Sequence, residues 1–111
     1  MKSKINSFLG LAQRSGNLVT GEDTTERSIK KNDIRLTIIA ENASDNTKKK
    51  FINMCKYREI PYALYGNKED LSQAIGKYNR TVYGVKDKGL ADHIISFIEQ
   101  ENNVSNNLGG E

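Results

Sequence analysis

A short basic segment with an aromatic ring in its middle is the first feature of this sequence that could bind a ligand. It reads Gly-Lys-Tyr-Asn-Arg at residues 76–80 and joins a predicted helix to a predicted strand. An unpaired nucleobase can stack on a tyrosine ring while lysine and arginine hold the neighbouring phosphates. The alternative is that Tyr78 covers the hydrophobic core, but loops of this composition are uncommon by accident. We therefore predict that RNA is contacted here by Lys77, Tyr78, Asn79 and Arg80.

A second basic segment spans residues 20–35, where a short predicted strand ends at a glycine and a polar helix begins. Free backbone N–H groups at such a helix start can face a phosphate, and an arginine can donate to guanine O6 and N7. Taken alone, the segment is more typical of a solvated helix face with i, i+3 and i+4 ion pairs. Its candidate RNA-binding residues are Gly21, Arg27, Lys30 and Lys31.

The groups that catalysis or metal binding would need do not cluster along the chain. His93 is the single histidine, and it lies beside the apolar stripe of a predicted helix, so we expect it on the surface. The sequence contains no G-x-G-x-x-G or Walker loop and no typical metal-ligand spacing. Glu69 and Asp70 lie at a helix start, where capping explains them. We predict that the chain is not an enzyme and uses no metal or cofactor.

Two further features have plain structural interpretations. The run Lys48-Lys49-Lys50 is more typical of a solvated helix face than of a binding site. Tyr57 lies near the end of the same predicted helix, and a structural role is favoured for it as well. Neither feature enters the predicted site.

Apolar spacing predicts helices that alternate with short strands, which defines an α/β class protein. Regular alternation implies a three-layer α-β-α sandwich with helices on both faces of a mixed sheet of about four strands. The most apolar strand, at residues 34–40, is expected at the centre of the sheet. The expected helices are 3–14, 22–31, 47–58, 68–75 and 90–99, and the expected strands are 18–20, 34–40, 61–65 and 81–85.

Length and composition limit the chain to one modest domain. Its 111 residues are 36% hydrophobic and 28% charged, so we expect a single domain at residues 1–101 and a disordered, asparagine-rich tail at 102–111. The net charge of +3 is a weak indication of nucleic acid binding. No apolar run approaches the ~20 residues of a membrane helix, and the basic start precedes no continuous apolar stretch. With Cys55 as the single cysteine, a reducing cytoplasm is expected.

Five segments, in their order and spacing, resemble the ribosomal protein superfamily typified by the archaeal L-seven-Ae and eukaryotic L-thirty-e proteins. The likeness is strongest to the small bacterial YlxQ-like members and covers roughly residues 5–98. The segments are 11–16 (LAQRSG), 19–22 (VTGE), 36–43 (LTIIAENA), 60–62 (IPY) and 71–77 (LSQAIGK).

The resemblance implies an α-β-α sandwich that binds kink-turns, which are sharply bent RNA elements with tandem sheared G·A pairs. The family's strand-to-helix segment carries Gly, Asn-Glu and Lys, and the similar positions here are Gly21, Asp23-Thr24 and Arg27. Glu22 lies among them and is added to the predicted site. The family's loop over an extruded base corresponds to residues 77–80. Because an ionised Asp23 only accepts hydrogen bonds, we expect RNA binding to be retained better than standard kink-turn specificity.

The combined expectation is a cytoplasmic, ribosome-associated protein that binds a bent or bulged, kink-turn-like RNA through residues 21–31 and 77–80. Its partner would be ribosomal RNA or a structured messenger element, with no membrane, and a monomer is expected. Two alternatives stay open. One is a protein-interaction module of the same fold, since +3 is a modest charge for an RNA binder. The other is a substrate-binding partner of an RNA-modifying enzyme, which would need a separate catalytic domain.

Overall fold

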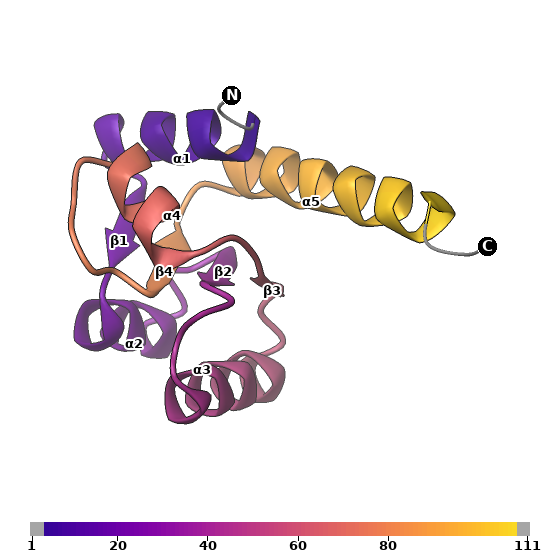
Figure 1. Cartoon of the computed structure of the whole chain (residues 1–111). Coiled ribbons are helices and arrows are strands. Elements are labelled where there is room, and N and C mark those ends of the chain that lie inside the picture. Colours follow the sequence, from indigo (N-terminus) through magenta and orange to yellow (C-terminus); the bar gives the residue numbers. More distant parts are fainter. Residues whose placement is uncertain (1–3, 109–111) are drawn as a thin grey trace.

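Helices and strands alternate along the whole described chain (Figure 1). The computed structural model describes the backbone of residues 4–108 and the side chains of residues 4–101. This order confirms the predicted alternation. The helices are α1 (Lys4–Arg14), α2 (Glu22–Lys30), α3 (Asp45–Arg58), α4 (Lys68–Ala74) and α5 (Lys88–Leu108), and the strands are β1 (Leu18–Thr20), β2 (Leu36–Ile39), β3 (Tyr62–Leu64) and β4 (Val82–Val85).

The four strands form one mixed sheet in the order β1-β4-β2-β3. β4 is antiparallel to both β1 and β2, whereas β2 and β3 are parallel, so β1, β2 and β3 all point the same way. β2 has a partner on each side, which confirms its predicted central place. The edge where β1, β2 and β3 end and β4 begins is called the carboxyl edge below. Helices α2, α3 and α4 all start at this edge, because each directly follows one of these strands.

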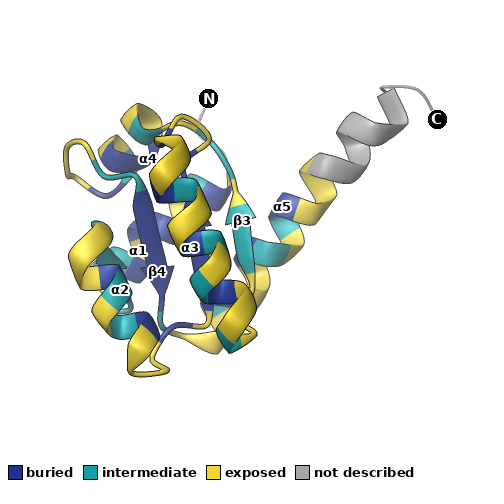
Figure 2. Ribbon diagram, turned by 90° about the horizontal axis from the view of Figure 1, so that it is seen from below, coloured by how far each residue is buried: buried dark blue, intermediate teal, exposed yellow. Residues whose placement is uncertain are grey.

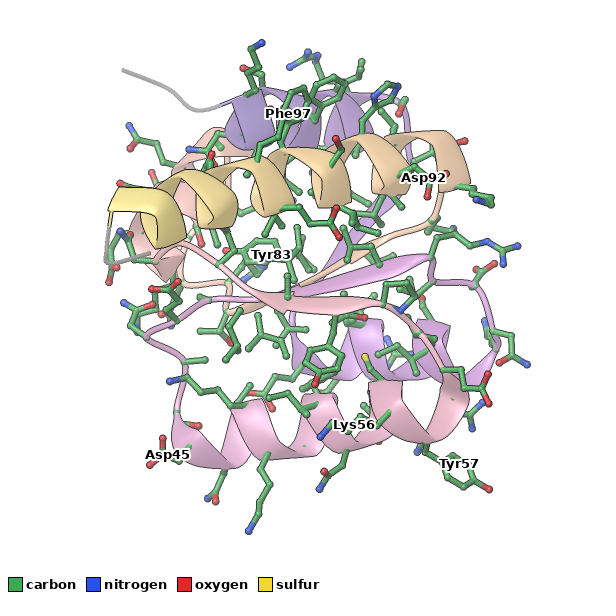
Figure 3. The ribbon with its side chains drawn as sticks, turned by 90° about the vertical axis from the view of Figure 1, so that its right-hand side faces the viewer. Asp45, Lys56, Tyr57, Tyr83, Asp92 and Phe97 are labelled. Carbon is green, nitrogen blue, oxygen red and sulfur yellow. The ribbon has the colours of Figure 1, made fainter. Side chains whose placement is uncertain are left out.

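Helices cover both faces of the sheet, as the α-β-α prediction required (Figure 3). Alternation along β2 sends Leu36 and Ile38 to the face covered by α1, α4 and α5, and Ile39 to the face covered by α2 and α3. Burying each such side chain contributes about 1.5–3 kcal/mol. Phe51 and Cys55 of α3 are fully buried on the second face, and burial raises the pKa of the Cys55 thiol. The core therefore fixes α2 and α3 side by side on one face.

α5 is longer than the helix predicted at 90–99. It runs to Leu108, into the segment expected to be disordered. Residues 109–111 and the side chains from residue 102 onward lie outside the described part, so the disorder of that tail stays a prediction. In the described residues, no helix combines the length and the apolar character needed to cross a membrane.

Candidate nucleic-acid interface

The two basic segments identified in the sequence lie next to each other in space. The side chain of Arg80 crosses from the loop before β4 to the end of β1, where its Nε donates to Thr20 Oγ1 at 3.2 Å. A Cβ atom added at Gly21 would lie 4.0 Å from Arg80 Cδ. Figure 1 shows the α4–β4 loop passing beside the start of α2. The helix entrance and the loop therefore form one continuous surface at the carboxyl edge.

Residues 77–80, called the basic turn below, are held by a buried hydroxyl. Ser72 Oγ accepts from Arg80 N at 2.9 Å and lies 3.2 Å from both the Arg80 carbonyl oxygen and Tyr83 Oη. The Tyr83 hydroxyl also donates to that carbonyl oxygen. Burial raises the pKa of Tyr83, which keeps the phenol protonated as a donor. These bonds fix the loop backbone before any ligand arrives.

The basic turn presents its aromatic ring to solvent. Tyr78 is 88% exposed, so the alternative that it covers the core is wrong. Asn79 adopts a left-handed φ of 57°, a conformation that asparagine tolerates better than most residues. Arg80 Nη1 donates to the Tyr78 carbonyl oxygen at 3.1 Å, which closes the turn. A surface hollow of about 410 Å³ is lined by this ring and its loop neighbours and by Glu69 and Gln73 of α4.

The start of α2 is an open helix end. Gly21 precedes it with φ 91° and ψ 155°, a backbone conformation that only glycine adopts without strain. No side chain caps the helix there. Gly21 itself is held by its N–H group, which donates to the Val82 carbonyl oxygen at 3.0 Å. The N–H groups of the first turn thus lack side-chain acceptors within the described residues. They carry the positive end of the helix dipole.

The predicted residues of α2 divide between two faces of the helix. Glu22 accepts from Thr47 Oγ1 at 2.8 Å, and Glu26 pairs with Lys50 of α3 at 2.8 Å and with Lys30 at 2.9 Å. The hydrogen bonds from Lys50 and Lys30 lower the pKa of Glu26 from 4.5 to about 2. This face joins α2 to α3, so Glu22 is directed at a neighbouring helix, and Lys30 is paired with Glu26 of its own helix.

The other face of α2 is open. Asp23, Thr24, Arg27 and Lys31 are all exposed, as are the outer surfaces of α2 and α3 in Figure 2. Arg27 and Lys31 make no ion pair among the described residues. At 1.5 Å per residue, Lys31 lies about 15 Å along the helix from Gly21. The residues gathered at the carboxyl edge are Gly21, Asp23, Thr24 and Arg27, called the α2 entrance below.

Carboxylates also line the carboxyl edge, at the starts of the neighbouring helices. Asp45 lies in the first turn of α3, and Glu69 and Asp70 lie in the first turn of α4, where they match the helix dipoles. Hydrogen bonds from its own backbone amide and from Asn42 lower the pKa of Glu69. The surface is therefore mixed in charge, with Arg27, Lys77 and Arg80 as its bases. Such a surface suits a ligand that offers both phosphates and hydrogen-bond donors.

Three residues that shape the interface were absent from the predicted site. Thr20 holds the Arg80 side chain, and Ser72 and Tyr83 hold its backbone. A signal for Ser72 existed, because it is a polar residue next to Leu71 and near Ile75 in a helix with a clear apolar side. Thr20 begins the second basic segment, but nothing there indicated that its hydroxyl holds Arg80, and no signal marked Tyr83.

Groups for metal binding do not converge in the described residues, which contain no cluster of three or more His, Cys, Asp or Glu side chains placed to hold an ion. His93 is exposed, as predicted, and its ring stacks on Phe8 with centroids 5.5 Å apart. This pair lies on the α1–α5 layer, on the face of the sheet away from α2.

Comparison with known proteins gives matches over most of the chain. The family model described as "Ribosomal protein L7Ae/L30e/S12e/Gadd45 family" matches residues 3–95. The chain is 37% identical over 92 residues to the "RNA-binding protein YlxQ" of Bacillus subtilis (strain 168), covering 83% of this chain and 92% of that protein. It is 36% identical over 98 residues to the protein of the same name from Enterococcus faecium, covering 88% and 94%.

Solved structures share the fold. A Bacillus halodurans protein described as having unknown function superposes with a TM-score of 0.86 at 37% identity, covering 88% of this chain and 99% of that one. The "Giardia lamblia 15.5kD RNA binding protein" superposes with a TM-score of 0.72 at 15% identity, covering 90% and 89%. At that identity the second likeness concerns the fold alone.

Proposed function

The chain belongs to the ribosomal protein L7Ae/L30e/S12e/Gadd45 family, and from that premise we propose that it binds a bent or bulged, kink-turn-like RNA through the α2 entrance and the basic turn. Two relatives at 36–37% identity carry the name RNA-binding protein, which supports RNA as the ligand class. No catalytic step is part of this function.

The observation that carries the proposal is the contact between Arg80 and Thr20. Residues sixty positions apart in the sequence meet there, and the contact joins an open helix start to an exposed tyrosine. Neither feature alone distinguishes an RNA surface from a solvated one. Together they place backbone amides that can bind a phosphate, a guanidinium that can bind a phosphate or a guanine, and an aromatic ring on which an unstacked base can lie.

In the proposed complex, a phosphate lies against the first-turn amides of α2 while Arg27 contacts a second phosphate or a guanine edge. Tyr78 stacks on a base that the bend has extruded, with Lys77 near its phosphate. The major groove of an RNA duplex is deep and narrow, so side chains cannot read the base edges there. Recognition therefore depends on the shape of the RNA and on unpaired bases. The preformed basic turn limits the entropy that ordering the loop would cost on binding.

Asp23 sets this chain apart from a plain phosphate-binding helix start. Its carboxylate is exposed at the α2 entrance and accepts hydrogen bonds without donating any. A phosphate or a guanine O6 placed next to it would be repelled, whereas guanine N–H donors would be attracted. The proposal is therefore RNA binding with an altered preference among bent elements.

The cellular setting is part of the same proposal. The protein is proposed to act as a monomer in the cytoplasm, in association with the ribosome, on ribosomal RNA or a structured messenger element. The family description, which names ribosomal proteins, supports this setting.

The proposal is tested by fluorescence anisotropy with a hairpin RNA that contains a kink-turn with tandem G·A pairs. Contact with three or four phosphates predicts that log affinity falls with log salt at a slope of about −2 to −4. The Arg27→Ala/Tyr78→Ala variant should bind at least about 10-fold more weakly, because it lacks a charge contact and a base stack worth about 1–3 kcal/mol.

Two controls sharpen the test. Lys4→Ala removes one charge from the opposite helix layer, where Lys4 lies over the Phe97 ring, and it should bind like the wild type. A hairpin whose G·A pairs are replaced by Watson–Crick pairs keeps the charge but loses the bend. Equal affinity for both hairpins, or a flat salt response, contradicts the proposal.

A further inference from the structure

A second tyrosine stands among bases at the far end of α3. Residues 56–58 read Lys-Tyr-Arg, which resembles the composition of the basic turn. Tyr57 is 85% exposed, nearly as much as Tyr78, and Figure 3 shows it projecting from the end of α3 away from the rest of the molecule. The structural role favoured for Tyr57 from the sequence is therefore wrong, because so little of its ring is buried.

The neighbouring bases are available. Lys56 is exposed and makes no ion pair among the described residues. Arg58 is held in place, since its Nη1 donates to the Lys30 carbonyl oxygen and to Asn32 Oδ1, each at 3.4 Å. Arg58 and Arg35 together line a surface hollow of about 280 Å³.

Most acids near this hollow are already neutralised. Asp92 pairs with Lys88 at 2.9 Å, and Asp33 lies 3.7 Å from Lys86. Glu59 is the lining acid without an ion pair in the described part of the chain. Among the described side chains, the charged groups without an ion pair at the end of α3 and in this hollow are thus Arg35, Lys56 and Arg58 against Glu59, which is an excess of positive charge. An exposed ring beside basic side chains matches an unpaired nucleotide strand, whose bases stack and whose phosphates are anionic.

We propose that Arg35, Lys56, Tyr57 and Arg58 form a second RNA-contacting surface, which binds unpaired nucleotides that flank the bent element. The inference rests on the proposed function, because it extends the RNA beyond the α2 entrance and the basic turn. Helix α3 begins at the carboxyl edge and ends at Arg58, so its 14 residues separate the two surfaces by about 20 Å. A stacked strand rising 3.4 Å per nucleotide spans that distance with about six nucleotides.

The experiment compares the kink-turn hairpin with the same hairpin extended by about ten uridines, more than the about six required, at its 5′ or its 3′ end. The wild-type chain should bind one of the extended hairpins at least about 5-fold more tightly than the hairpin alone, the gain expected from a single base–ring stack. The Lys56→Ala/Tyr57→Ala variant should lose this gain and bind the hairpin alone as the wild type does. Tyr57→Phe, which keeps the ring, and Lys4→Ala should both retain it.

The inference is overturned if neither extension improves binding, or if the gain persists in the double variant. A failure of the proposed function is distinguishable, because the wild type would then not bind the hairpin alone. In that case, binding of a separate oligouridine, without the hairpin, is measured. If the wild type binds it weakly and Tyr57→Ala does not, the second surface is supported. If the wild type does not bind it, the second surface is overturned. Since Tyr57 is almost fully exposed, thermal unfolding should show that Lys56→Ala/Tyr57→Ala and Tyr57→Phe are as stable as the wild type.

Discussion

Replacing Ser72 by alanine should loosen the basic turn without removing any side chain that is proposed to contact RNA. Ser72 lies in α4 and is buried, and its hydroxyl accepts the hydrogen bond from Arg80 N. The same hydroxyl lies within bonding distance of the Arg80 carbonyl oxygen and of Tyr83 Oη. Alanine removes all of these interactions but adds no bulk.

The size of the effect follows from the groups left behind. In Ser72→Ala, the part-buried Arg80 N–H loses its acceptor, and such a loss costs about 1–3 kcal/mol of unfolding free energy. Tyr83→Phe is the matched variant. It removes one donor to the Arg80 carbonyl oxygen but leaves the Ser72 hydroxyl in place, so its cost should stay near 1 kcal/mol.

Urea denaturation measures the stability, and anisotropy with the kink-turn hairpin measures the binding. If Ser72 acts through the position of the Tyr78 ring, then Ser72→Ala weakens binding in the wild type but not in a Tyr78→Ala background. Two effects that simply add in the double variant would show that the two residues do not act together. The reasoning is refuted if Ser72→Ala unfolds at the wild-type urea concentration.

Three further outcomes follow from the α2 region. Gly21→Ala should lower the unfolding free energy by about 1–3 kcal/mol, because a φ of 91° strains an alanine even though there is space for its Cβ atom. Denaturation followed by circular dichroism measures this change, and an unchanged value would contradict the assigned backbone conformation. Asp23→Asn should bind the kink-turn hairpin up to about 5-fold more tightly, since it removes about 1 kcal/mol of repulsion from a phosphate, and weaker binding would mean that the carboxylate accepts from a base. Lys50 and Lys30 depress the pKa of Glu26, so the ionised Glu26 should stabilise the fold fully above pH 4.5 and lose this effect as the pH falls towards about 2. The difference in unfolding free energy between the wild type and Glu26→Gln, measured across this pH range, should therefore shrink as the pH falls.

The fold was largely predictable because apolar periodicity reports directly on burial. The strand predicted at residues 34–40 contains β2, whose four residues are all buried, as expected for a short apolar run in the centre of a sheet. Element ends were less predictable. α3 begins at Asp45, two residues before the predicted start, because the Ser44 side chain caps it by accepting from Thr47 N. Such a cap depends on local geometry that composition alone does not give.

The candidate site was predictable only in part. Tyr78 and Arg27 could be named because their residue types suit RNA, and both are exposed. The pairing of Glu26 with Lys50 was not visible, since these residues meet only after α2 and α3 pack together. The same holds for the bond between Arg80 and Thr20. Contacts between distant segments decide which charges remain free, and a single sequence carries no record of them.

The sheet order has a consequence for the chain as it leaves the ribosome. β1 is made before the other strands, but its partner in the described sheet is β4, which is made after β2, β3 and α4. A nascent chain that stops before Val82 thus has a β1 without a neighbour and an unfilled gap between β1 and β2. The basic turn leads into this late strand, so it meets the α2 entrance only after β4 has paired with β1. RNA affinity should therefore appear abruptly, once Val82–Val85 has been made, and not grow gradually as the preceding elements are synthesised.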